Sequence, residues 1–404
     1  MAAAALVALA SGAVAAAPVR VPVVVTNATA GAAAGLPVVV RMVDLPPIPG
    51  ADWRGTAALD AAGQPIACQV DDLDADGRLG ADDELALLLD APAGESTVYL
   101  LPPPSSAAPA PWREPAVAAS ADPVAGSVTA ENGLVRVELR SGEREAKTHA
   151  VSCRHGGEWI TLASQRIDTV KLDDQWEGWE NRESRVALIA AGAVRARLRH
   201  TVIKANARSR KTVAVVSDYS VYAGRREIES VLRVVNTSAD QVVLLSYAVT
   251  GFYDVSPGGA YDVDRDRFAG LLPDGRMVDG ALRTTGYHLG RCSSVPILWC
   301  AAWPGGDQRP QLGLGWVPIE PLHSVYGAVL ADVARGDRHA LRLTISHEFR
   351  GNTLWPGDGY GFRQWLCPDP AAPAGTRAWA ELCGGISVTV GAPEDTSGTT
   401  GERP

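Results

Sequence analysis

The chain of 404 residues is predicted to be an all-β protein, with a small N-terminal β-sandwich or barrel followed by a large antiparallel β-sandwich of the supersandwich kind. Short β-rich runs separated by turn residues fill 19–101, as in a small sandwich or barrel. Longer runs between 186 and 249 are typical of two antiparallel sheets packed face to face. No stretch shows a convincing helical period.

The small domain is expected at 18–102. Its strands are expected where apolar and β-branched residues cluster between turns, at 19–26, 36–43, 57–59, 65–70, 85–89 and 96–101. A Pro-, Ala- and Ser-rich run without periodicity follows, which indicates a stiff linker and a domain boundary at 103–124.

The large domain is expected at 125–391. Its strands are predicted at 134–139, 186–190, 194–203, 212–221, 227–235, 241–249, 295–301, 311–317, 340–346 and 386–390. The polar end, 392–404, is predicted to be disordered.

Residues 1–17 form an apolar, Ala-rich run that ends in small residues, which is typical of a secretory signal peptide. An ordinary Ala-rich N-terminus is the alternative, because the usual positive start is missing. No stretch predicts a membrane span. The net charge of −9 argues against nucleic acid as the main partner. We therefore expect a secreted or periplasmic protein.

Six cysteines allow fifteen disulfide connectivities, and an exported protein tolerates disulfides. Cys292 with Cys300 and Cys367 with Cys383 are plausible local pairs. Buried free thiols are the alternative.

An acidic stretch at 71–84 carries the most specific motif in the chain. Counted from Asp72, carboxylates occupy positions 1, 3, 5 and 12 of a calcium loop, with Gly77 at position 6. Ca²⁺ prefers six or more oxygen ligands, and the glycine permits the tight turn that brings alternate carboxylates together. The expected ligands are Asp72, Asp74, Asp76 and Asp83. A solvated acidic turn is the alternative. Strand-like flanks indicate a structural ion rather than a sensor.

Arginines alternate with apolar residues at 194–202 and fall on one face of a predicted strand. These arginines would be either solvated or the floor of a groove for an anionic polymer. His200 falls on the apolar face and is expected to be a core histidine.

Aromatic residues on Gly-rich segments are candidate sugar contacts, because flat aromatic faces suit sugar rings. Plugs at the ends of a sandwich are the alternative. The candidates are Trp176, Trp179, Trp355, Tyr360 and Trp365.

Several segments resemble exported bacterial polysaccharide-degradation proteins of the rhamnogalacturonan-lyase-like group. They are GQPIACQVDDLDADG (63–77), DDELA (82–86), PAGESTVYL (92–100), ENGLVRVEL (131–139) and DYSVYAGRR (218–226). The resemblance covers 19–390 and implies a small β domain before a large sandwich like that of galactose mutarotases. The helical toroid that follows the sandwich in some relatives has no counterpart in the sequence.

A polysaccharide lyase needs a base for the proton at C5 of a uronic acid and a positive group to neutralise the carboxylate. Tyr287, His288 and His347 are candidate bases, and Arg350 is the candidate neutralising group. Each is of the required residue type, although a structural role is the commoner one for any single residue. We therefore predict β-elimination on an acidic polysaccharide. The alternatives are a non-catalytic carbohydrate-binding protein and a glycoside hydrolase with paired carboxylates. The candidate carboxylates for hydrolysis are the cluster Asp254, Asp262, Asp264 and Asp266, with Glu320 and Glu348 nearby in sequence.

Overall fold

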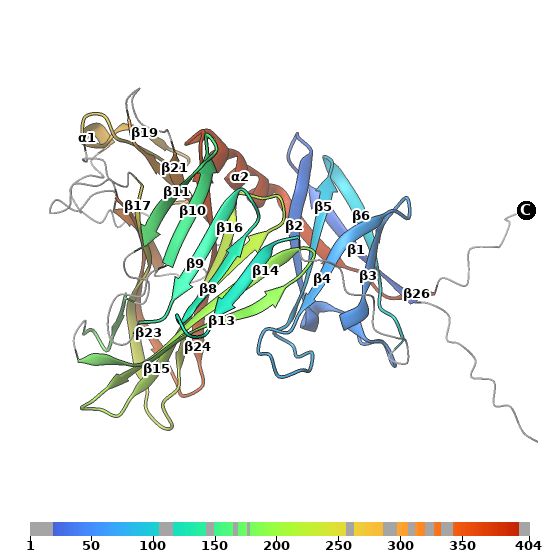
Figure 1. Ribbon diagram of the computed structural model, residues 1–404, viewed down its shortest axis with the longest axis horizontal. Helices are drawn as coiled ribbons and strands as arrows, with labels where there is room; N and C mark the ends of the chain where they lie inside the picture. The colour runs from blue at the N-terminus through green and yellow to red at the C-terminus, as the bar shows by residue number, and fades with distance from the viewer. Residues whose placement is uncertain are drawn as a thin grey trace, which may run out of the picture.

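A computed structural model describes residues 19–104, 116–142, 149–164, 169–175, 178–255, 262–285, 297–305, 312–319, 327–332 and 342–395. The described residues form two unequal β domains that lie side by side (Figure 1). The predicted all-β class is confirmed. Neither α helix in the described residues is long and apolar enough to cross a membrane.

The small domain is one strongly curved antiparallel sheet in the order β2-β5-β4-β3-β6-β1-β25, with β26 also paired to β1. Two 3₁₀ turns, Met42–Asp44 and Trp53–Gly55, join its strands. The strands are β1 (Val19–Asn27), β2 (Ala33–Arg41), β3 (Ala57–Asp60), β4 (Pro65–Asp71), β5 (Glu84–Ala91), β6 (Gly94–Leu101), β25 (Ile386–Val390) and β26 (Glu394–Asp395).

The last two strands come from the far end of the chain. The expected boundaries assigned 386–390 to the large domain, but Val388 pairs with Val25 of β1. The chain thus crosses between the domains twice, and the small domain is completed only when its C-terminal strands are in place.

The large domain consists of two sheets. The outer sheet has the order β22-β23-β17-β11-β10-β9-β8-β7, with β12 paired to β17. Its strands are β7 (Ala118–Asp122), β8 (Ser127–Glu131), β9 (Val135–Arg140), β10 (His149–His155), β11 (Glu158–Ser164), β12 (Thr169–Leu172), β17 (Val243–Asp254), β22 (Gly327–Asp332) and β23 (Arg342–Leu354). Strand β7 begins inside the predicted linker.

The inner sheet faces the small domain and has the order β13-β14-β15-β16-β24-β21-β20-β18-β19. Its strands are β13 (Trp179–Ala191), β14 (Arg195–Asn206), β15 (Thr212–Tyr222), β16 (Ile228–Asn236), β18 (Arg267–Leu271), β19 (Met277–Ala281), β20 (Trp299–Trp303), β21 (Gly313–Pro318) and β24 (Gly359–Asp369).

Apolar side chains fill the space between the two large sheets. Val137 of β9 and Leu198 of β14 belong to this core, and both are fully buried. A second core lies under the small domain, where Val23 of β1 joins Trp365 of β24 and Trp379 in one cluster. Both faces of the inner sheet are therefore covered over much of their area.

Two helices interrupt the strands, although none was expected. Helix α1 (Leu282–Thr285) is a single turn, whereas α2 (Ala374–Gly385) has three turns and lies between the two domains (Figure 1). Trp379 of α2 packs edge-on against Trp365, with ring centroids 5.1 Å apart. Ala-rich composition after Pro373 and the closing pair Gly384 and Gly385 were the sequence signals for this helix.

The alternation predicted for 194–202 is present in β14. Ala196, Leu198 and Val202 are buried in the cores between the sheets. His200, as expected, is a core histidine: its Nδ1 lies 2.9 Å from His149 Nε2 and its Nε2 lies 3.0 Å from Ser184 Oγ.

Within the described residues, Cys153, Cys300, Cys367 and Cys383 are free thiols, so the expected pair of Cys367 with Cys383 is not formed. The alternative of free thiols therefore holds for these four. Cys292 lies outside the described residues.

Candidate functional site

The predicted lyase residues fall in the least described part of the chain. Tyr287 and His288 lie outside the described residues. His347 and Arg350 belong to β23, where the His347 backbone pairs with Ala248 of β17 and Val329 of β22. The catalytic role of these four residues stays a prediction.

The predicted aromatic contacts do not form one surface. Trp176 lies outside the described residues, while Trp179 and Tyr360 are partly buried against the core at the far end of the sandwich. Trp365 is only 6% exposed and packs between Tyr222 and Trp379. The prediction of a sugar contact is wrong for Trp365, because its apolar ring completes the core beneath the small domain.

Trp355 is the exposed exception, with 62% of its surface accessible. It begins the tight turn between β23 and β24. Its N–H donates to Asp358 Oδ2 over 3.1 Å, and the Asp358 N–H donates back to the Trp355 carbonyl over 2.9 Å. Asn236 accepts from the Gly357 N–H and donates to the Leu354 carbonyl, which fixes the turn to β16. The indole ring of Trp355 is thus exposed on a turn whose backbone is fixed by hydrogen bonds.

The acidic loop between β4 and β5 brings three of its four predicted ligands together. Carboxylate oxygens of Asp72, Asp74 and Asp76 lie within 4.8 Å of one another. Gly77 has a φ of +78°, which a glycine adopts without strain, and its N–H donates to Asp72 Oδ2 over 2.9 Å. Asp83 is placed differently, since its oxygens accept from the N–H groups of Leu73 (2.7 Å) and Gly80 (2.6 Å).

Two observations fit a cation in this loop. Asp72 Oδ1 is buried and has no hydrogen-bond partner among the described residues, which is costly without a positive ligand. Although a hydrogen bond from the Asp76 N–H lowers the pKa of Asp74, burial, the Asp72 side chain and the charges of Asp76 and Asp83 raise it on balance. Like charges held this close favour either protonation or an ion.

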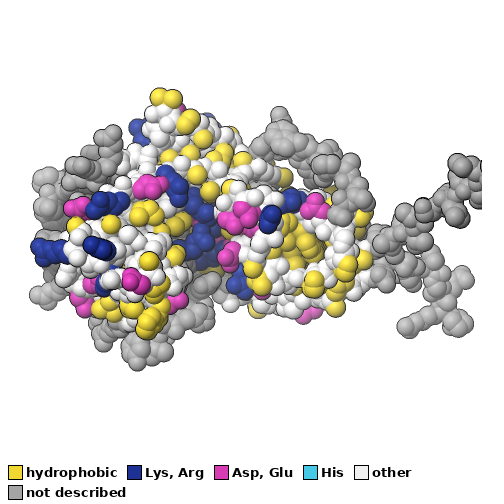
Figure 2. Space-filling view, turned by 90° about the horizontal axis from the view of Figure 1, so that it is seen from below, with side chains coloured by type: hydrophobic (Ala, Val, Ile, Leu, Met, Phe, Trp, Pro, Cys, Tyr) yellow, Lys and Arg dark blue, Asp and Glu magenta, His cyan; other side chains and the backbone are white. Residues whose placement is uncertain are grey.

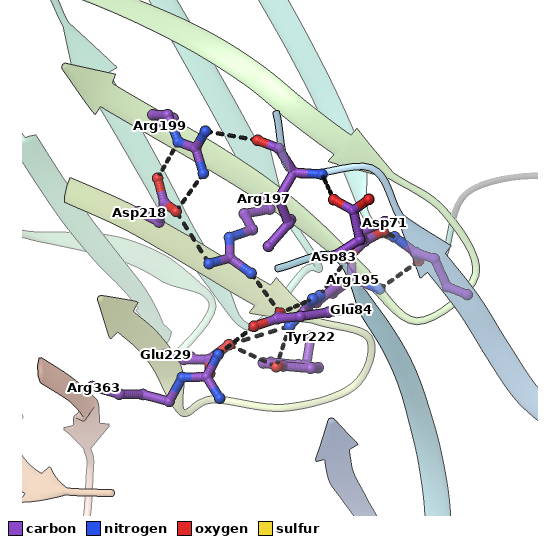
Figure 3. Close-up of polar contacts among 12 residues, drawn as sticks. Asp71, Asp83, Glu84, Arg195, Arg197, Arg199, Asp218, Tyr222, Glu229 and Arg363 are labelled. Carbon is purple, nitrogen blue, oxygen red and sulfur yellow. Dashed lines mark hydrogen bonds and ion pairs between the residues drawn. The ribbon is translucent and has the colours of Figure 1, made fainter. Parts of the chain in front are cut away.

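The flanks of the loop join a buried network of charges between the domains (Figure 3). Arg195 of β14 donates to Asp71 Oδ2 over 2.8 Å and to Glu84 Oε2 over 2.6 Å. Arg197 donates to the same Glu84 oxygen over 2.6 Å, and Arg363 of β24 pairs with the other oxygen. Glu84, the first residue of β5, is only 4% exposed.

The network continues across the inner sheet. Asp218 accepts from Arg197, Arg199 and Arg233, and Glu229 accepts from Arg195 and Arg363. Arg199 also donates to the Leu73 carbonyl over 2.7 Å, inside the acidic loop. Five arginines of the inner sheet thus meet four carboxylates, of which Asp71 and Glu84 come from the small domain.

The charged forms of these groups are stabilised by one another. Burial alone would raise the pKa of Glu84, but the charges of Arg195, Arg197 and Arg363 hold it well below its ordinary value. The pKa values of Asp218 and Glu229 are likewise lowered by neighbouring arginines in spite of burial. Buried carboxylates with this many partners remain ionised at neutral pH.

Both predictions for the arginines of 194–202, a solvated face and the floor of a groove for an anionic polymer, are wrong. Arg195 and Arg197 are 0% and 2% exposed, so they are neither solvated nor open to a polymer. The two domains meet with basic side chains on one lobe and acidic side chains on the other (Figure 2). Asp71 and Glu84 were the partners that sequence reasoning missed. The sequence signal for these partners was their position: Asp71 ends the strand before the acidic loop, and Glu84 begins the strand after it.

Of the carboxylates considered for hydrolysis, Asp262, Asp264 and Asp266 have described contacts, whereas Glu320 and the side chains of Asp254 and Glu348 lie outside the described part of the structure. Asp266 is fully buried and accepts from the N–H groups of Asp262 (3.0 Å) and Gly305 (3.1 Å). Asp264 pairs with Arg283 at the surface. These contacts hold a loop in place.

Searches for similar proteins found no matching family model and no matching curated protein, whereas solved structures do match. An alpha-mannosidase from Enterococcus faecalis matches at 10% identity and a TM-score of 0.50, over 93% of this chain and 46% of its own. A glycosyl hydrolase family 38 protein from the same organism matches at 10% identity and a TM-score of 0.50, over 92% and 47%. A GH36 alpha-galactosidase from Geobacillus stearothermophilus matches at 12% identity and a TM-score of 0.41, over 62% and 40%.

The likeness is one of fold. The chain spans less than half the length of each of these three proteins. Neither of the two Enterococcus faecalis proteins is named as a polysaccharide lyase, so the rhamnogalacturonan-lyase resemblance stays a prediction.

Proposed function

We propose that this chain is an exported carbohydrate-recognising β-sandwich protein, which binds a polysaccharide in the setting of glycoside hydrolysis. The observation that carries the proposal is the fold, shared over 92–93% of the chain with two Enterococcus faecalis proteins named for glycoside hydrolysis. Export rests on the signal-like run at 1–17, which lies outside the described residues.

Trp355 supplies the contact. An exposed indole on a hydrogen-bonded turn offers a large flat surface to the C–H face of a sugar ring. Because the turn is already held in place, binding costs little further ordering. Non-catalytic binding is favoured over hydrolysis, because two of the candidate carboxylates, Asp264 and Asp266, make contacts that hold a loop in place.

The test is a panel of neutral and acidic polysaccharides, with binding followed by affinity electrophoresis. Trp355→Ala is expected to weaken binding about tenfold, since a stacked aromatic contributes about 1–3 kcal/mol. Met277→Ala, at another exposed apolar residue (41% accessible), is the control and is expected to bind as wild type does. Equal binding by wild type and Trp355→Ala would show that Trp355 does not contact the polysaccharide. No binding to any polymer would contradict the proposed function.

Incubation with the same panel of polysaccharides also tests for catalysis, through the reducing ends and unsaturated products that are released. Reducing ends without unsaturated products support hydrolysis, as in the proteins with the shared fold. Unsaturated products support β-elimination with Tyr287, His288 or His347 as the base and Arg350 as the neutralising group. Tyr287→Phe and His347→Gln would then abolish the unsaturated product without abolishing binding.

We also propose that Asp72, Asp74 and Asp76 hold a structural Ca²⁺, with Asp83 fixing the loop. The unpartnered buried oxygen of Asp72 and the close spacing of the three carboxylates support this. Bound Ca²⁺ would offset their repulsion and stabilise the turn that joins β4 to β5.

A further inference from the structure

The small domain contains a cavity of about 640 Å³, far from the acidic loop. Its size lies within the range of small-ligand pockets, about 300–1,000 Å³. Its described lining residues come from the β3–β4 hairpin, the end of β5 and the start of β6. They are Asp60, Ala61, Ala62, Pro65, Ile66, Ala67, Leu88, Leu89, Asp90, Glu95, Ser96, Thr97 and Val98.

The cavity exists because β4 changes partners. Pro65 and Ile66 pair with β3, whereas residues from Ala67 onward pair with β5. A tight turn at 92–93 connects β5 to β6. The two strands separate beyond this turn, because the β3–β4 hairpin lies between them in the sheet.

This separation leaves strand edges open toward the cavity. Leu89 pairs only with Leu36 of β2, and Ser96 and Thr97 pair only with β1, within the described chain. Backbone N–H and C=O groups on such edges need partners, which solvent or a ligand supplies. The rim is rigid, because Asp60 Oδ1 accepts from the N–H groups of Ala62 (2.9 Å) and Gln64 (2.7 Å) across the hairpin turn.

The charge of the lining is one-sided. Three carboxylates contribute to the wall: those of Asp60, Asp90 and Glu95. Among the described lining residues none is basic. Asp60 and Asp90 each use one oxygen for backbone N–H groups, and the described chain supplies no partner for their second oxygens or for Glu95. Ile66 and Leu88, both partly buried, contribute apolar surface to the wall.

We propose that this cavity binds a sugar unit that carries a protonated amine. The open strand edges and the hydroxyls of Ser96 and Thr97 serve the sugar hydroxyls, and the apolar wall receives its C–H face. The carboxylates attract the ammonium group and disfavour a uronate, because like charges that face each other across an interface are repulsive. That the ligand is a sugar rests on the proposed function. That it carries an amine rests on the carboxylates of the cavity wall.

The test is calorimetric titration of the full chain with glucosamine, glucose and glucuronate at low and high salt. Glucosamine is expected to bind most tightly, with an affinity that falls as salt rises. The double change Asp90→Asn with Glu95→Gln is expected to weaken glucosamine binding about tenfold or more, because hydrogen bonds to charged groups are stronger than neutral ones. The amides keep the shape, including the Asp90 acceptor for the Gly35 N–H.

Glu158→Gln, an exposed carboxylate at the start of β11, is the matched control and should leave binding unchanged. Ala61→Trp places a bulky ring on the exposed hairpin at the rim and should block binding without touching the core. Equal binding of glucosamine and glucose, tighter binding of glucuronate, or unchanged binding in both the double variant and Ala61→Trp would each overturn the proposal.

Failure of this inference and failure of the proposed function are distinguishable. Trp355→Ala should leave glucosamine binding intact, whereas the double variant should leave Trp355-dependent polysaccharide binding intact. Loss of one activity therefore leaves the other standing.

Discussion

Glu84 is the residue on which the contact between the domains depends most. Three arginines of the inner sheet pair with its two oxygens, and it is buried. Glu84→Gln keeps the shape but removes one of the four carboxylate charges, so the five arginines of the network are left with three carboxylates. We expect the free energy of unfolding to fall by about 3–5 kcal/mol, as for other broken buried pairs. Urea denaturation measures the change.

Glu138→Gln is the matched control, because Glu138 pairs with Arg140 on an exposed strand face. Exposed pairs contribute about 0–1 kcal/mol, so this change should be nearly neutral. A loss from Glu84→Gln no larger than that of the control would show that the network does not stabilise the fold.

The same residue predicts the response to acid. The pKa of Glu84 is lowered in the folded protein, as are those of Asp218 and Glu229. Their contribution to stability is therefore complete above the unfolded carboxyl pKa, about 4. It is lost as the pH falls below that value toward the folded pKa. Unfolding free energies measured from pH 6 downward should fall steeply below about pH 4 in wild type and less steeply in Glu84→Gln. Parallel curves would contradict this assignment.

At the scale of elements, β25 is the strand whose placement was least expected. It pairs with β1 through five residues and follows directly on α2, which packs between the domains. Truncation after Gly385 removes β25 and β26 and exposes an edge of β1. We expect the melting temperature to fall by about 5 °C or more. Truncation after Asp395 keeps both strands and should change little, and equal melting temperatures would show that β25 is dispensable.

The acidic loop is the element through which an ion would act. Its carboxylates converge, and its Leu73 carbonyl accepts from Arg199 of the inner sheet. If Ca²⁺ binds, chelation should lower the melting temperature by about 5 °C, since a ligand that binds only the folded state stabilises it. Asp74→Ala with Asp76→Ala should abolish that sensitivity, whereas Asp274→Ala, in the distant β18–β19 turn, should retain it. No response of wild type to chelation would contradict the proposal.

The sequence predicts a feature well when that feature depends on neighbouring residues, and poorly when it depends on residues distant in the sequence. The period of two in 194–202 correctly separates Leu198 and His200 from the arginines, because alternation is a local property of a strand. What covers Arg195 and Arg197 is not local: it depends on Asp71 and Glu84, more than a hundred residues away. The same holds for Trp365, whose ring is buried by α2 and not by its neighbours in sequence. For the acidic loop, local spacing correctly predicts the convergence of Asp72, Asp74 and Asp76.

At the scale of the whole molecule, the two domains are tied at several places. The chain passes from the small domain to the large one and returns through α2 to β25. Arg225, which follows β15, donates to the Ala34 carbonyl of β2, and Gln69 of β4 accepts from the N–H groups of Val194 and Arg195. An interface of this kind, with an apolar cluster and a buried charge network, should make the two domains unfold together.

Differential scanning calorimetry measures this directly. We expect one transition for wild type, with calorimetric and van't Hoff enthalpies that agree. In Glu84→Gln the contact between domains is weakened while each core is retained, so the transition should split or the van't Hoff enthalpy should fall below the calorimetric one. Glu138→Gln should keep the single transition. Two well-separated transitions in wild type would show that the domains fold independently, and that the buried arginines position the small domain without coupling its stability to that of the large one.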